Sequence, residues 1–288
     1  MPTPRLHRRG FTLVELMVSI IVLSIVAGGL VEMLRSQGRF MEQQEAWRSS
    51  RGVARSSLNR LYSDLRDVEV GGGVEAAASG GQDITLRVPY AFGVMCSSSG
   101  SNTTLSLIPV DSAMFAGPGF SGFAWRDATG VYQYVATGVT LTAPGTASSC
   151  TSASVTMLPS ISGSPAGTVV NVAGTVSPVP PIGTVFFLYR RVRYEFKAST
   201  ILPGRTGLWR TLVTTGATEE LATPFAATAR VNFYVVSSST PQAAVPTMST
   251  IRGLQLVLDG ESEKAPRGSG APKLTQLSTS LFFINRND

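Results

Sequence analysis

The chain begins with one long apolar segment, and its pattern of polar and apolar positions changes twice further on. Residues 11–34 are mostly apolar, and Glu15 is the first acidic residue among them. About 20 such residues are enough to cross a bilayer as a helix. The pattern therefore predicts a transmembrane helix over residues 11–34.

The helical pattern continues beyond this segment but becomes two-sided. Over residues 35–69 the apolar positions keep helical spacing, and arginines and acids occupy the other faces. No proline interrupts residues 11–88, so we expect one helix from about 12 to 68, ended by Gly71, Gly72 and Gly73. The stripe consists of Met33, Leu34, Phe40, Met41, Trp47, Ala54, Leu58, Leu61, Leu65 and Val68.

From residue 70 onward the pattern is that of strands joined by Gly/Ser/Pro-rich connectors such as Ala116–Gly122. Runs of strands after one helix predict an α+β fold, in which a mainly antiparallel β head packs on the second half of the helix. We interpret residues 90–180 as a variable, insertion-like region of the head 70–288. The predicted strands are 83–88, 104–110, 131–137, 139–142, 154–158, 183–196, 208–214, 229–236, 251–258 and 276–285.

The residues before the apolar segment carry positive charge only. Arg5, Arg8 and Arg9 precede Gly10, and no acid lies among residues 1–10. By the positive-inside rule the amino end stays in the cytoplasm and the head is exported. A removable signal peptide has a shorter apolar stretch and a cleavage site of small residues, and a plain signal anchor leaves the carboxylate of Glu15 without a role.

The basic leader followed by Gly10-Phe11-Thr12-Leu13-Val14-Glu15 resembles the amino-terminal signal of type IV pilins and type II secretion pseudopilins. The resemblance implies that residues 1–10 are a leader, which a prepilin peptidase removes between Gly10 and Phe11 before it methylates Phe11. It also implies that Glu15 pairs with the amine of a neighbouring subunit. The alternatives for Glu15 are a pair with its own amine or a place among the lipid headgroups.

The physical chemistry of this segment agrees with that role. Cleavage would create an amine at Phe11, about 6 Å along the helix axis from Glu15. Each charge is costly alone in a low dielectric, and an opposite charge nearby offsets part of the cost. A pair made between subunits would therefore favour one register of assembly.

Parts of the head show a second, more diffuse resemblance. Leu61–Arg66, Tyr189–Tyr194, Leu208–Arg210, Ile251–Leu258 and Leu281–Asn287 are similar to minor pseudopilin J of type II secretion and to W-type minor pilins. This implies a low-copy subunit that primes or caps a filament in the inner membrane. Its partners would be other pilin or pseudopilin subunits, the prepilin peptidase and the inner-membrane assembly platform.

Composition argues against an enzyme. The chain of 288 residues is 43% hydrophobic and 15% charged, which argues against a fully disordered chain, and its single histidine, His7, lies in the predicted leader. Histidine-based catalysis and histidine zinc sites are therefore disfavoured. We expect no catalytic residue, metal or cofactor. A membrane-anchored binding module or enzyme that keeps its leader is the competing class.

The two cysteines, Cys96 and Cys150, are too few for a zinc site, and both belong to the exported part, where disulfides form. A disulfide between them is one expectation, and two free buried thiols are the other.

The net charge of +6 raises the question of nucleic acid. Loss of the three leader arginines leaves +3, which is modest for this length. Arg190, Arg191 and Arg193 cluster, but strand alternation divides them between two faces. Nucleic acid is therefore not the expected partner, and a DNA-uptake filament is retained as an alternative function.

Overall fold

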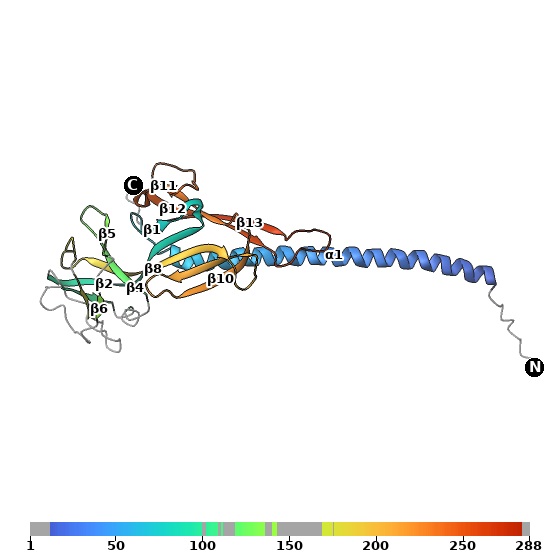
Figure 1. Cartoon of the computed structure of the whole chain (residues 1–288), viewed down its shortest axis with the longest axis horizontal. Coiled ribbons are helices and arrows are strands. Elements are labelled where there is room, and N and C mark those ends of the chain that lie inside the picture. Colours follow the sequence, from blue (N-terminus) through green and yellow to red (C-terminus); the bar gives the residue numbers. More distant parts are fainter. Residues whose placement is uncertain are drawn as a thin grey trace, which may run out of the picture.

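A computed structural model describes residues 12–99, 102–108, 111, 119–135, 140–142, 169–174 and 176–283. A helix of 53 residues, α1 (Leu13–Leu65), projects from a β-rich head (Figure 1). The predicted α+β class is confirmed, since one long helix precedes a mainly antiparallel sheet.

The helix ends earlier than the sequence predicts. Its last helical residue is Leu65, and the glycines at 71–73 lie in the turn that follows. Val68 is fully buried, and its amide donates to the carbonyl of Leu65. The packing of Val68 into the core thus bends the chain away from the helix axis before the glycines are reached.

All strand pairs in the described residues are antiparallel, and they form one sheet with the path β11-β12-β10-β9-β8-β2-β3-β7-β6. Strand β1 pairs with β2, β13 pairs with β12, and β4 joins β5 to β8. The strands are β1 (Val74–Ala77), β2 (Asp83–Ser99), β3 (Asn102–Leu107), β4 (Phe120–Arg126), β5 (Tyr132–Val135), β6 (Thr140–Thr142), β7 (Val169–Ala173), β8 (Val185–Ala198), β9 (Thr206–Leu212), β10 (Thr218–Phe225), β11 (Arg230–Val235), β12 (Ile251–Glu261) and β13 (Leu274–Phe282).

Strands β1, β4, β7 and β10 were not predicted, and the prediction at 154–158 lies outside the described residues. The connector predicted at Ala116–Gly122 is wrong at its end, because β4 begins at Phe120. A Cβ on Gly122 would meet the carbonyl oxygen of Val135 at 1.9 Å, and its φ is +156°. Gly122 therefore permits the close approach of two strands, although the Gly/Pro/Ser-rich sequence around it is typical of a loop.

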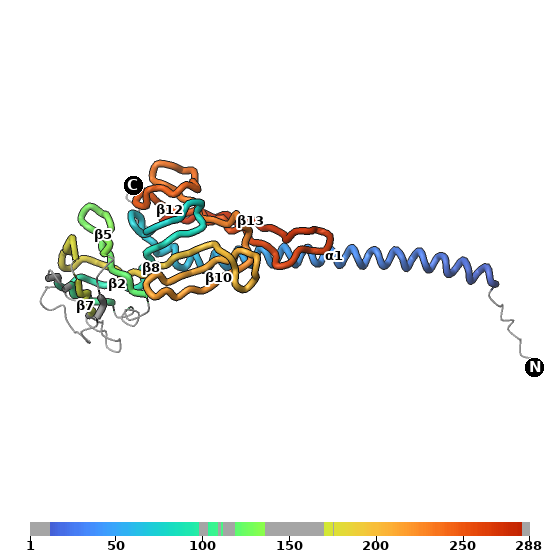
Figure 2. Tube along the Cα trace, viewed as in Figure 1, coloured from blue at the N-terminus to red at the C-terminus, as the bar shows by residue number. Residues whose placement is uncertain are grey.

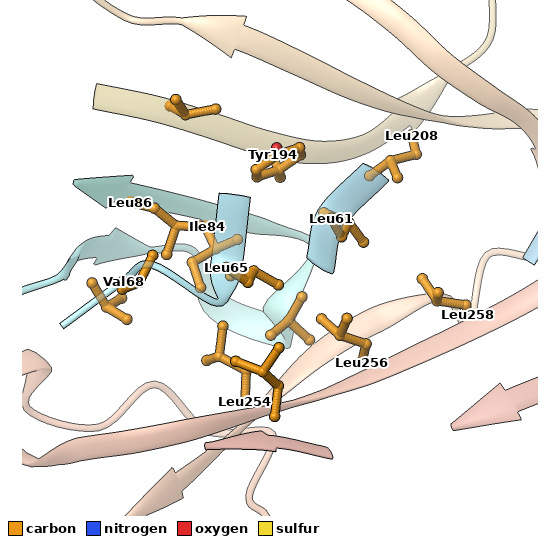
Figure 3. Packing of buried hydrophobic residues seen from close by; sticks show 14 of the residues in the cluster. Leu61, Leu65, Val68, Ile84, Leu86, Tyr194, Leu208, Leu254, Leu256 and Leu258 are labelled. Atoms are coloured by element: carbon orange, nitrogen blue, oxygen red, sulfur yellow. The ribbon is translucent and has the colours of Figure 1, made fainter. Parts of the chain in front are cut away.

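The sheet wraps around the carboxyl half of α1 and encloses the main core. Leu61, Leu65 and Val68 lie between strands of both sides (Figure 3). Near β11 the two ends of this wrap approach each other, since the side-chain amide of Gln82 donates to the carbonyl of Ala227 at 3.3 Å. Burial on all sides fixes this half of the helix in the head.

A second core fills the part of the head that lies beyond the end of α1 (Figure 2). Met95, Leu105, Phe123 and Leu188 are fully buried there, and the rings of Phe123 and Trp125 stack at 5.6 Å. This core has no helix in it, so the distal part of the head is held by strand packing.

The predicted amphipathic stripe is confirmed at its carboxyl end. Nearer the apolar segment, the positions that α1 buries differ from the predicted ones. Ala54, Leu61 and Leu65 are buried, whereas Phe40, Met41 and Trp47 remain exposed. Small residues face the sheet in their place, because the β12–β13 hairpin comes very close to the helix. These small buried residues are Ala46 and Ser50, and Ser57 is buried further along the helix.

The tightest part of this contact gives a stability prediction. A Cβ on Gly260 would lie 2.3 Å from the carbonyl oxygen of Ser50, so Gly260→Ala should lower the free energy of unfolding by about 1–3 kcal/mol. Gly52 is a matched control on the exposed side of α1, with nothing within 4 Å, and Gly52→Ala should stabilise by up to about 1 kcal/mol. Denaturant unfolding of the full chain in detergent measures both. Equal stability of the two variants would contradict this close packing.

Candidate assembly site on the amino-terminal helix

The first turn of α1 is closed by a reciprocal pair of side chains. The hydroxyl of Thr12 accepts a hydrogen bond from the amide of Glu15 at 3.2 Å, and the carboxylate of Glu15 accepts one from the amide of Thr12 at 3.5 Å. This is a capping box, which satisfies two backbone donors at the start of a helix. This capping box was not predicted, although Thr12-Leu13-Val14-Glu15 has the required spacing.

The surface around this turn is apolar and uncovered. The side chains of α1 from Leu13 to Leu34 are all exposed, and this helix is long and apolar enough to cross a membrane. The mean hydropathy of its most apolar window is 2.4, and none of that window is buried. Such a surface needs lipid or other helices around it, because its exposure to water is unfavourable.

Of the predicted processing residues, Gly10 and Phe11 lie outside the described residues, and Glu15 lies in the first turn of α1. Glu15 is exposed, and among the described residues its carboxylate accepts one hydrogen bond, the long bond from the amide of Thr12. The carboxylate therefore retains room for a stronger partner, such as a positively charged amine.

A polar cluster joins the far end of α1 to the sheet. Tyr194 of β8 donates to the carboxylate of Asp64, and Arg210 of β9 pairs with the same carboxylate at 3.1 Å. Burial, followed by the nearby charge of Asp64, raises the pKa of Tyr194, so the hydroxyl remains a donor. No local sequence pattern predicts this cluster, since Asp64 lies 130 residues from Tyr194 and 146 residues from Arg210.

The arginine cluster of β8 is divided between the two faces of the sheet, as predicted. Arg191 pairs with Glu75 at 2.6 Å and Arg193 pairs with Asp83, while Arg190 lies over the ring of Tyr90 at 4.2 Å. Two of the three guanidinium groups are thus engaged by acids of the same chain, and they do not form one basic surface for nucleic acid.

Cys96 lies buried in β2 and is not a free thiol, and Cys150 lies outside the described residues. The pairing of these two cysteines therefore stays a prediction. Among the residues that the structure covers, no group of three or more His, Cys, Asp or Glu side chains could hold a metal ion.

Comparison with known proteins gives one match, to the amino-terminal segment. Residues 5–31 match the family profile described as the prokaryotic N-terminal methylation motif. No curated protein and no solved structure matches the chain.

The match covers the basic residues before Gly10, the first turn of α1 and most of the apolar surface described above. It is the signal of type IV pilin-like proteins, and it supports processing by prepilin peptidase. Pilin-like proteins are generally structural, and the motif implies assembly with other pilin subunits. Together with the exposed apolar helix, it indicates a membrane anchor.

The predicted disulfide has a measurable effect on stability. The separation of 54 residues between Cys96 and Cys150 gives a stabilisation of about 4 kcal/mol in the chain-entropy model. Reduction of the full chain in detergent should lower its free energy of unfolding by about this amount, and mass spectrometry should detect two added hydrogens. Cys150→Ser is the control and should show no response to the reductant. An unchanged unfolding curve of the wild type on reduction would contradict the bond.

Proposed function

We propose that this protein is a minor pilin or pseudopilin, a non-catalytic subunit that enters a type IV pilus or a type II secretion pseudopilus. The observation that carries the proposal is the methylation motif at residues 5–31, which coincides with an apolar helix surface that the head leaves uncovered. A surface of this kind is suited first to lipid and later to the helices of neighbouring subunits.

The pathway begins in the inner membrane, with the amino end in the cytoplasm and the head on the other side. Prepilin peptidase cuts between Gly10 and Phe11 and methylates the new amine of Phe11. Removal of the leader also removes Arg5, Arg8 and Arg9, which hold the amino end at the cytoplasmic face. The assembly platform then draws the helix from the bilayer into the filament.

Glu15 provides the polar contact of this transfer. Its carboxylate pairs with the amine of Phe11 in a neighbouring subunit, and the attraction is strong because the surrounding helices exclude water. The capping box supports the arrangement, since it holds Glu15 in the first turn while its charge remains accessible.

The size of the head supports a role at the filament tip. A second core beyond the end of α1 extends the head away from the helix, and a subunit that primes or caps the filament has free space above it. The diffuse resemblance to minor pseudopilin J and W-type minor pilins points in the same direction.

Cleavage can be tested directly. The mature protein recovered from cells should begin at Phe11 and carry one methyl group on its amine, as read by mass spectrometry of the amino-terminal peptide. Gly10→Val should block the cut and leave Met1 in place. A wild-type chain that keeps residues 1–10 would instead identify a membrane-anchored module outside any filament.

The charge of Glu15 can be separated from its capping role. Glu15→Gln keeps a hydrogen-bond acceptor for Thr12 but removes the charge, whereas Glu15→Ala removes both. We expect both variants to be cut normally and to enter filaments about tenfold less than the wild type, because the ion pair is lost.

Glu32→Gln is the matched control, since Glu32 is an exposed acid of the same helix that pairs only weakly with Arg35 at 3.8 Å. It should enter filaments normally. The content of each variant in sheared filaments, relative to its cleaved pool in the membrane, is the measurement. Normal entry of Glu15→Gln would show that capping, and not charge, is what Glu15 provides.

A further inference from the structure

In the part of the head that the structure describes, strand β13 forms the longest unprotected edge of the sheet. Of the strands that the structure describes, β13 pairs with β12 alone, over nine residues from Leu274 to Phe282. The register of this pair runs without a bulge from Gly253↔Phe282 to Glu261↔Leu274.

The pairing with β12 identifies which backbone groups of β13 are unused. The amide of Phe283 donates to Arg252, and the amide of Ser262 donates to the carbonyl of Lys273, so the odd-numbered residues between these bonds face β12. The even-numbered residues direct their N–H and C=O groups away from β12, and their side chains are exposed. These residues are Leu274, Gln276, Ser278, Ser280 and Phe282.

The strand has none of the features that usually protect an edge. Its sequence LTQLSTSLF holds no charged residue, no proline and no glycine. Proteins generally protect edge strands with charges, prolines, bulges or short length. Most other edges in the described part are short or partly covered: β1 and β5 have four residues each, β6 has three, and β11 is bridged through Phe233 to Gln242. Strand β10 pairs with β12 at Phe225 alone, but its edge carries two acids and a proline.

The edge also lies beside the surface that the proposed function uses. The hydroxyls of Ser50 on α1 and Thr275 on β13 are 2.6 Å apart, and Arg267 in the β12–β13 loop pairs with Glu42 at 3.2 Å. The hairpin therefore runs along α1 toward the apolar half (Figure 1), and β13 runs in the same direction as the helix. A strand added to β13 would lie next to a neighbouring helix packed against α1.

We propose that β13 accepts an extended strand from a different pilin-like subunit, which continues the sheet across the boundary between two heads. This inference rests on the proposed function. The added strand satisfies the five outward amides and carbonyls and covers Leu274 and Phe282, which are 47% and 53% exposed.

A second copy of this chain does not fit the same edge. Two identical β13 edges pair symmetrically only when the strands are antiparallel, since the same backbone groups must meet their own counterparts. Because β13 runs along α1, that pairing would point the two helices in opposite directions. Two chains anchored in one membrane with the same orientation cannot adopt it.

The decisive variant is Ser278→Pro, with Ser278→Ala as its control. The amide of Ser278 faces away from β12, so proline there removes an outward donor and leaves the pairing with β12 intact. Ser278→Ala removes the same side chain and keeps the donor. We expect Ser278→Pro to be cut normally and to fall about tenfold in filament content relative to its cleaved pool, while Ser278→Ala matches the wild type.

Hydrogen exchange on the unmodified chain gives a second, independent readout. The amides of the five outward residues should exchange rapidly in the full chain purified alone in detergent. In the filament assembly recovered from cells they should slow about tenfold or more, because they become hydrogen-bonded. Thermal unfolding in detergent tests whether the Ser278→Pro variant is folded.

The outcomes separate the two proposals. Normal filament content of a folded Ser278→Pro, or equal exchange of these amides in both states, would overturn the added strand and leave the proposed function intact. A wild-type chain that is cut but never enters a filament would overturn both.

Discussion

The structure depends on how one helix is covered along its length. The carboxyl half of α1 buries Leu61 and Leu65 inside a sheet that wraps around it, while Leu13 to Leu34 are left exposed. Apolar burial on one half fixes the helix to the head, and the same physical effect makes the other half seek lipid or protein. One half of α1 is thus part of the core of the head, and the other half of the same helix is an apolar surface that the head leaves uncovered.

The exposed half holds two acids, Glu32 near its end and Glu15 at its start, and apolar packing alone does not explain Glu15. Glu15 sits in the first turn, where its carboxylate meets the amide of Thr12 and the positive end of the helix dipole. Both interactions stabilise an acid at this position within a single chain. They offset only part of the free energy that burial of the carboxylate would cost, and an amine from a second subunit would offset more of it.

The sequence predicted the helix, the α+β class and the processing segment because each has a local pattern. The apolar run, the spacing of Ala54, Leu61 and Leu65, and the residues around Gly10 can all be read within short windows. What it missed depends on distant contacts. Gly122 has the local sequence of a loop, and its place in a strand depends on the contact with Val135. Ser50 has the polarity of a surface residue, and its burial depends on the contact with Gly260. The cluster of Asp64, Tyr194 and Arg210 has no signature at all in sequence spacing.

The apolar segment of α1 and the edge strand β13 are separated by only a short length of helix. The apolar segment ends near Leu34, and Arg267 in the β12–β13 loop pairs with Glu42 of the helix. Eight residues at the helical rise span about 12 Å, so with residues 13–34 in a bilayer, as proposed, the tip of the β12–β13 hairpin would lie close to the membrane surface. Heads of neighbouring subunits anchored in the same way would stand at similar heights, with β13 facing sideways. Strand addition could then begin in the membrane, and it would select a partner before the apolar helices leave the lipid together.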